Sequence, residues 1–236
     1  MIATETKFQK VKKKYALNNS YFKFRAYGTP GTPLEIMQYF KEHGDLPFLY
    51  SGTNWLYDCY CEYQKRHGVY QSQFFTPDST AQIIAEWAPY FLTIKDPVLD
   101  ACCGFGQLTT PFVKMGYQNV TGFDYSQDMV NLYELNTNCK AAQYSIEEYE
   151  GKGFSCIVSN PPYEIPTLTQ FIDKLHKMLT EDGTAILLIP KNTIDKKSPK
   201  ALAQAIQKFV IVHRQDMKEK FERTAVSAEI VVLEKR

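Results

Sequence analysis

The spacing of apolar residues predicts alternating strands and helices from residue 71 onward. The clearest helix is predicted over residues 168–179, where apolar side chains recur every three or four positions, and Gly183 is expected to end it. Such alternation predicts a mostly parallel sheet covered by helices. Seven strands are expected, at residues 97–100, 120–124, 141–144, 155–159, 184–189, 210–213 and 229–234.

Another helix is predicted immediately after Thr76. Thr76 can act as its N-cap, and Pro77 can take the first helical position, where a missing N–H costs nothing. Ile83, Ile84 and Trp87 would then form its buried face. This helix is expected to precede the first strand of the sheet.

The N-terminal part of the chain has a different pattern. Residues 1–30 are predicted to be loosely structured, and a linker rich in Gly and Pro follows at residues 28–33. Two amphipathic stretches between Leu34 and His67 predict a small helical layer. We therefore expect a basic arm with a helical extension over residues 1–70 and a separate α/β domain over residues 71–236.

Charge is unevenly distributed, although the net charge of the 236 residues is only +1. Residues 1–25 hold seven Lys or Arg against one acid, and residues 191–236 hold eleven against six. Basic ends around an acidic middle suit an anionic polymer such as nucleic acid, whereas the alternative is a solvated tail. The sequence shows neither a bilayer-spanning apolar run nor a secretion signal, so we expect a cytoplasmic protein without membrane contact.

The six cysteines do not form a recognisable metal or redox motif. No two of them have the two-residue spacing of a zinc knuckle or a redox dithiol. Cys59 and Cys61 are close together, but no second pair follows at a useful spacing. We therefore expect mostly reduced core thiols and no metal site.

A glycine-rich loop follows the first predicted strand. The strand ends at Asp100, Gly104 and Gly106 follow, and a helix is expected to start near Gln107. Glycines allow the backbone to approach a ligand closely, although tight turns also use them for structural reasons. An aspartate at this strand end suits a cationic ligand group better than a phosphate, and S-adenosylmethionine carries such a cation.

The next predicted strand ends at Asp124, about twenty residues after the loop. A carboxylate at this place can accept both hydroxyl groups of a ribose. A pyrophosphate ligand fits less well, because Thr109 stands where the third glycine of the dinucleotide motif belongs. The alternative for Asp100 and Asp124 is a purely structural role as cap or turn residues.

The most specific motif is Asn160-Pro161-Pro162-Tyr163, which follows an apolar strand. The prolines fix the backbone, so the Asn160 side-chain oxygen and the Pro161 carbonyl point in set directions. An aromatic amine is a poor nucleophile because its lone pair is shared with the ring, and two acceptors can hold its N–H groups in a reactive geometry. Tyr163 can stack on a planar substrate, which in duplex DNA requires a flipped base.

In these motifs, residues 73–234 resemble the N6-adenine DNA methyltransferases, in which a Phe-Phe-Thr-Pro segment precedes the glycine loop. The resemblance implies a Rossmann-like methyltransferase fold with a C-terminal antiparallel strand, S-adenosyl-L-methionine as cofactor and transfer to adenine N6 in DNA. It implies that Asn160, Pro161, Pro162 and Tyr163 are catalytic and that Tyr163 and Phe221 bind the substrate base. The cofactor-binding residues that it implies are Phe75, Thr76, Pro77, Asp100, Cys102, Gly104, Gly106, Asp124, Tyr125, Ser145 and Asn160.

Two departures from that family leave alternatives open. The family usually has an Asp after the third strand to hold the adenine amine of the cofactor, and here the sequence reads Tyr144-Ser145-Ile146. The stretch after Lys191 is too short for a separate recognition domain, so recognition could come from the helical N-terminal layer, from the loop 191–200, or from a partner, either a specificity subunit or another copy of the chain. DNA is favoured over RNA; the alternatives are RNA adenine N6 methylation, protein glutamine N5 methylation and a non-catalytic methyltransferase-like binding module.

Overall fold

The computed structural model describes residues 74–195, 198–217, 221 and 226–236. The chain divides into two compact units, residues 1–73 and 74–236. The basic arm, the helical layer and the Cys59–Cys61 pair that the sequence predicts lie outside the described residues.

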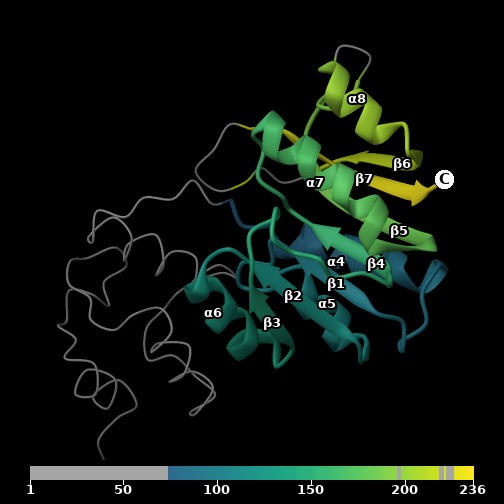
Figure 1. Ribbon diagram of the computed structural model, residues 1–236. Helices are drawn as coiled ribbons and strands as arrows, with labels where there is room; N and C mark the ends of the chain where they lie inside the picture. Colours follow the sequence, from purple (N-terminus) through teal and green to yellow (C-terminus); the bar gives the residue numbers. More distant parts are fainter. Residues whose placement is uncertain (1–73, 196–197, 218–220, 222–225) are drawn as a thin grey trace, which may run out of the picture. The chain divides into compact units, whose positions relative to one another are not determined.

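The second unit contains one seven-stranded sheet with the order β3-β2-β1-β4-β5-β7-β6 (Figure 1). β7 runs antiparallel to both of its neighbours, and the pairs from β3 to β5 are parallel. The predicted mostly parallel sheet with a C-terminal antiparallel strand is thereby confirmed. The strands are β1 (Val98–Ala101), β2 (Val120–Asp124), β3 (Lys140–Gln143), β4 (Phe154–Ser159), β5 (Leu179–Pro190), β6 (Phe209–Asp216) and β7 (Ala228–Lys235).

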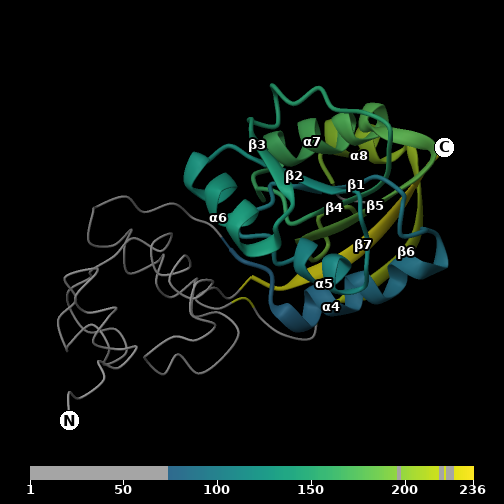
Figure 2. The same ribbon diagram turned by 90° about the horizontal axis from the view of Figure 1, so that it is seen from below.

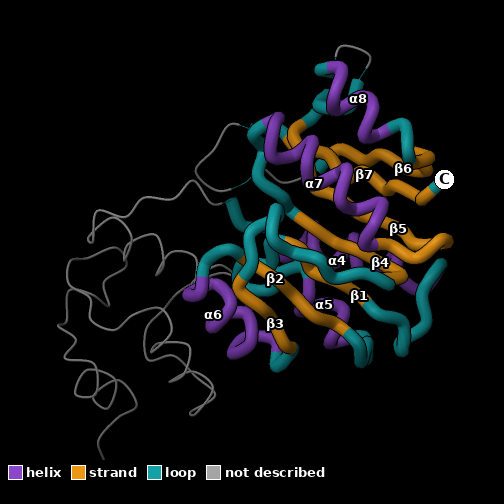
Figure 3. The backbone as a smooth tube through the Cα atoms, viewed as in Figure 1, coloured by secondary structure: helices purple, strands orange, loops and turns teal. Residues whose placement is uncertain are grey.

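Helices cover both faces of the sheet, as Figures 2 and 3 show. One face carries α4 (Asp78–Trp87), α5 (Thr109–Lys114) and α6 (Gln127–Thr137), with the 3-10 helix η1 (Ala88–Tyr90) after α4. The opposite face carries α7 (Ile165–Met178) and α8 (Lys200–Ile206). Two-sided coverage is expected when parallel strands are joined by helical crossovers of one hand. None of the helices in residues 74–236 that the structure describes is long and apolar enough to cross a membrane.

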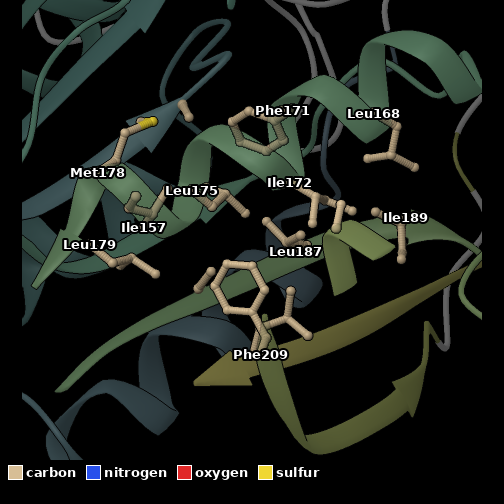
Figure 4. Close-up of a cluster of buried hydrophobic side chains, with 14 of the residues drawn as sticks. Ile157, Leu168, Phe171, Ile172, Leu175, Met178, Leu179, Leu187, Ile189 and Phe209 are labelled. Atoms are coloured by element: carbon tan, nitrogen blue, oxygen red, sulfur yellow. The ribbon is translucent and has the colours of Figure 1, made fainter. Parts of the chain in front are cut away.

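Each face of the sheet has its own apolar core. Under α7, the buried Phe171 and Leu175 pack with Ile157 of β4 and Leu187 of β5 (Figure 4). The other face buries a second cluster beneath α4 and α5, to which Ile186 of β5 belongs. Neighbouring residues of β5 therefore serve opposite cores, which explains why this strand is apolar along most of its length.

Several element boundaries differ from those predicted from the sequence; α7, for example, begins at Ile165 and not at residue 168. Helix α4 begins at Asp78 with Pro77 as the N-cap residue, and no side chain caps it, so Thr76 lies one position too early to act as the cap. Helix α7 ends at Met178 because Leu179 adopts an extended backbone and pairs with Phe154, which leaves Gly183 inside β5. The helix expected near Gln107 is present: α5 begins at Thr109, and Thr110 N already donates to the Gly106 carbonyl at 2.8 Å.

We expect Phe171→Ala to lower the free energy of unfolding by about 3–5 kcal/mol, because it leaves a cavity in the core under α7. Urea denaturation measures this change. Lys177→Ala, at an exposed position of the same helix, should change the stability by no more than about 0.5 kcal/mol. Equal losses in the two variants would contradict the assignment of the buried face of α7.

Candidate functional site

The glycine loop and the Asn160 motif leave the sheet side by side. Ala101, the last residue of β1, pairs with Ser159, the last residue of β4. The buried Ser159 hydroxyl donates a hydrogen bond of 2.7 Å to the Ala101 carbonyl, which joins the two strand ends. β2 ends beside them, because Phe123 pairs with Ala101. The predicted site residues of three strands therefore meet at the carboxyl edge of the sheet, where ligands of open α/β sheets bind.

The backbone of the glycine loop is left-handed at three positions. Cys102 has φ of 56°, and Gly104 and Gly106 have φ of 50° and 82°. A left-handed conformation costs about 1–2 kcal/mol at a residue other than glycine, so Cys102 carries local strain. The Cys102 thiol is free and half-buried, and burial raises its pKa well above the ordinary value, so it remains protonated.

The two glycines of the loop have different surroundings. A Cβ atom on Gly104 would lie 3.2 Å from the ring of Phe75. A Cβ atom on Gly106 would overlap Thr137 and would lie 2.9 Å from the ring of Tyr133, both on α6. Gly106 therefore allows the loop to pack closely against α6, whereas Gly104 lies against the segment that precedes α4.

Asp100 lies beneath the loop and is almost completely buried. Its Oδ2 accepts a hydrogen bond of 2.8 Å from the Thr109 hydroxyl, and Thr109 Oγ1 lies 2.9 Å from the Tyr133 hydroxyl. Its Oδ1 has no hydrogen-bond partner among the described residues. Burial raises the pKa of this carboxyl, and a nearby cation would lower it again. An unpaired buried acceptor of this kind fits the cationic end of a ligand, as the sequence predicts.

Asp124 ends β2 with both carboxylate oxygens bound to the backbone. Its Oδ2 accepts from Gly104 N and its Oδ1 from Ser126 N, each at 3.0 Å. Burial raises the pKa of this carboxyl, and these backbone donors oppose the shift. Each carboxylate oxygen has a second lone pair for a ligand hydroxyl. The neighbouring Tyr125 is exposed.

The loop after β3 reaches the same region. Tyr144 N donates to the Asp124 carbonyl at 3.0 Å, which places the loop beside the end of β2. The Ser145 hydroxyl donates to Glu148 Oε2 at 2.9 Å, so the hydroxyl predicted to meet the cofactor is engaged within its own loop. The neighbouring Tyr144 is exposed.

The carboxamide of Asn160 is held at both ends. Its Nδ2 donates a hydrogen bond of 2.6 Å to the Phe74 carbonyl, and its Oδ1 accepts one of 2.8 Å from the Tyr163 hydroxyl. The Phe74 carbonyl can only accept, so the amide nitrogen must point toward it and the amide oxygen toward Tyr163. Of the two prolines, Pro161 is buried and Pro162 is exposed.

Tyr163, which donates to this carboxamide oxygen, belongs to a group of three aromatic rings. The ring centroids of Phe74 and Tyr163 are 6.2 Å apart with an interplanar angle of 18°, and Phe221 lies 6.1 Å from each of them. We call Phe74, Tyr163 and Phe221 the aromatic cluster. Burial raises the pKa of Tyr163, so its hydroxyl remains a hydrogen-bond donor. The structure thus brings together the two residues predicted to bind a planar substrate.

The segment that precedes α4 connects the two motifs. The Phe74 carbonyl binds Asn160, and the ring of Phe75 stacks on Phe105 of the glycine loop with centroids 4.1 Å apart. Thr76 and Pro77 are buried behind it. Phe105, Tyr133 and the Phe74 carbonyl could not be identified from the sequence, because neither a ring between two glycines nor a main-chain acceptor has a recognisable sequence signal.

Comparison with known proteins agrees with this geometry. Residues 98–183 match the family model described as a methyltransferase domain, a match that includes the glycine loop, Asp124 and the Asn160 motif. No curated protein matches the sequence.

Among solved structures, a modification subunit of a proposed type I restriction enzyme from Vibrio vulnificus YJ016 is similar, with a TM-score of 0.58, 14% identity and coverage of 80% of this chain and 51% of the other. Magnesium protoporphyrin IX methyltransferase from Synechocystis PCC 6803 with bound SAM has a TM-score of 0.56 and 15% identity, covering 89% and 100%. TrmN from Thermus thermophilus has a TM-score of 0.54 and 17% identity, covering 68% of this chain, which spans 49% of the length of that protein. These similarities show the Rossmann-like methyltransferase fold.

We expect Gly106→Ala to destabilise the protein more than Gly116→Ala. Both glycines have a left-handed backbone, which costs about 1–2 kcal/mol with a side chain. Only at Gly106 would the new methyl group overlap α6, which adds about 1–3 kcal/mol of overpacking, whereas nothing lies within 4 Å at Gly116. Urea denaturation compares the two variants, and equal losses would show that the loop does not pack closely on α6.

We expect Asn160→Asp to make stability depend on pH. Ionised, the new carboxylate would face the Phe74 carbonyl at the 2.6 Å contact, whereas protonated it could donate there. Its pKa in the folded state should therefore exceed the unfolded value of about 3.9, so stability is retained below that value and lost as the pH rises through the folded pKa. Thermal unfolding between about pH 4 and 8 measures this loss, and Asn160→Ala should show no such additional pH dependence.

Proposed function

We propose that the chain methylates the exocyclic N6 amine of adenine in DNA, because residues 98–183 match a methyltransferase domain model and S-adenosyl-L-methionine is the cofactor of this fold. The observation that carries this proposal is the orientation of Asn160. Its amide oxygen faces the aromatic cluster, while its amide nitrogen is bound to the Phe74 carbonyl. The site thus offers an acceptor to a flat molecule that carries an amino group.

The residues fit the cofactor as well as the amine. The unpaired Asp100 Oδ1 suits a cationic group. Asp124, proposed to bind the ribose, is oriented by the hydrogen bond that its Oδ2 accepts from Gly104 N. Bound S-adenosyl-L-methionine supplies an electrophilic methyl group on a sulfonium. Asn160 Oδ1 and the Pro161 carbonyl accept the two N–H groups of the substrate, which directs the nitrogen lone pair away from both acceptors.

The transfer needs no base before the nitrogen attacks. Bound S-adenosyl-L-methionine would give up its methyl group and keep the electron pair on sulfur as a neutral thioether, and the nitrogen held by Asn160 Oδ1 and the Pro161 carbonyl would lose one proton to solvent. Tyr163 would stack on the substrate ring, and Phe221, whose ring centroid lies 6.1 Å from that of Tyr163, would contact the same substrate ring. Adenine in a duplex must be flipped out to reach them, and stacking offsets part of that cost.

The aromatic cluster favours a nucleobase over a glutamine side chain. A base exposes a wide aromatic face to Tyr163, whereas a glutamine carboxamide is much smaller and has no ring. The Phe-Phe-Thr-Pro segment, which binds Asn160 and packs on the glycine loop, supports DNA over RNA because of its resemblance to the DNA enzymes.

The loop after β5 is a second candidate for contacts with the nucleic acid. The buried Glu229 forms a bidentate ion pair with Arg214, at 2.8 and 2.7 Å, and also accepts from Asn192 N at 3.1 Å. These bonds hold the start of this loop at the carboxyl end of β5, the edge that carries Asn160. We infer that this loop, a specificity subunit or a second copy of the chain contributes to sequence recognition.

Transfer of labelled methyl groups to DNA, RNA and protein, followed by nucleoside mass analysis, tests the proposal. We expect N6-methyladenine in DNA. Asn160→Ala should keep the rise in Tm that S-adenosyl-L-methionine produces but should lower turnover by about 10²–10³-fold or more, because an acceptor for the amine is lost. Asn131→Ala, at an exposed position on α6, is the matched control and should behave as wild type.

Two further variants separate the roles of the site. Tyr163→Ala should lower turnover far more than cofactor affinity, and Asp124→Ala should do the reverse. Methyl transfer to RNA or protein but not to DNA would refute the substrate assignment. Unchanged turnover in Asn160→Ala would refute the catalytic role of the motif.

A further inference from the structure

The loop between β3 and β4 contains a single helical turn that is fixed at its beginning. Glu148 Oε2 accepts hydrogen bonds from Ser145 N at 3.1 Å and from the Ser145 hydroxyl at 2.9 Å. In return, Glu148 N donates to Ser145 Oγ at 3.3 Å, and Tyr149 N donates to the Ser145 carbonyl at 3.1 Å. This reciprocal arrangement is a capping box. One turn alone is not stable in water, so its other end also needs support.

Lys174 of α7 provides that support. Its ammonium donates to the carbonyl oxygens of Ile146, Glu147 and Tyr149 at 3.0, 2.6 and 2.9 Å. Glu150 Oε1 lies 3.2 Å from the same nitrogen. A lysine ammonium has three N–H donors, and the carbonyls at the end of a helical turn lack partners within the turn. The Lys174 side chain is only 17% exposed, so these bonds are largely shielded from water.

The turn packs directly against the end of β2. The ring of Tyr149 stacks on Phe123 with centroids 4.1 Å apart, and Ile146 is buried in the core under α7. Phe123 is followed by Asp124, whose carbonyl accepts from Tyr144 N. The turn is thus next to the acid assigned to the ribose, and its position depends on bonds from a helix on one face of the sheet.

We propose that Lys174 is a positioning residue for cofactor binding, which holds the turn 145–149 beside Asp124 as a wall of the site for the adenosine half of S-adenosyl-L-methionine. The proposal rests on the methyltransferase function and not on the choice of DNA as substrate. Lys174 acts through the carbonyls that it binds. Loss of its ammonium leaves three carbonyls without their donor and frees the turn to move away from Asp124.

Lys174→Met tests this role, because methionine keeps an unbranched apolar side chain but has no donors. Calorimetric titration without a methyl acceptor should show binding of S-adenosyl-L-methionine and of adenosine weakened by a similar factor, about tenfold. Turnover at saturating cofactor should remain near the wild-type value. Lys174→Arg, which keeps the charge and the donors, should recover part of the affinity. Lys177→Met, three residues along α7 at an exposed position, should bind as wild type.

The possible outcomes separate this proposal from the function. A fall in the Tm of the free protein with unchanged affinity in both Lys174 variants would make the residue purely structural and would overturn the proposal. Lower turnover at saturating cofactor with unchanged affinity would also overturn it. If no polymer is methylated while Lys174→Met still weakens binding, the substrate assignment fails and the role of Lys174 stands. Absence of cofactor binding by the wild type would refute both.

Discussion

Parallel pairing of β1 with β4 is the constraint on which the site depends. The register places Ala101 against Ser159, and the Ser159 hydroxyl closes the pair on the Ala101 carbonyl. Asp100 and the glycine loop lie at the end of β1, and Asn160 and Pro161 follow β4, so this pairing sets groups proposed for the cofactor beside those proposed for the amine. A register shift of one residue would move Asn160 along the edge and turn its side chain toward the opposite face.

Helix α7 links the two halves of the site from the opposite face of the sheet. It begins two residues after Tyr163, and its Lys174 binds the loop that adjoins Asp124. Its apolar face lies on β4 and β5, so the helix is fixed by the core rather than by the site. A rigid helix can hold catalytic and cofactor-binding segments in a constant relation, whereas two independent loops could not.

Local sequence patterns were sufficient for much of the fold and part of the site. Strands such as β2 and β4 could be predicted because short apolar runs between turn residues have few alternatives. The Asn160 motif and the glycine loop could be identified because the residues of each motif are adjacent in the sequence. By contrast, the end of α7 and the location of Gly183 depend on the pairing of Leu179 with Phe154 in the sheet. Local propensity cannot predict this pairing, because the two residues are 25 positions apart.

The contacts that complete the site join residues far apart in the chain. Asn160 is oriented by a carbonyl 86 positions earlier, and Lys174 binds carbonyls more than 20 positions earlier. Main-chain acceptors are present at every residue, so no side-chain pattern identifies which of them will be used. The stacking of Phe75 on Phe105 has the same origin, since only the folded chain brings the two rings together.

The bond between the Asn160 amide nitrogen and the Phe74 carbonyl has a consequence for selectivity. The carboxamide cannot rotate by half a turn without setting two oxygens against each other, so only its oxygen is presented to the aromatic cluster. A purine with an amino group at position 6 can donate to that oxygen, whereas one with an oxo group there would be repelled. Discrimination at purine position 6 between adenine and hypoxanthine or guanine would thus depend on the Phe74 carbonyl, a main-chain acceptor outside the proposed catalytic motif.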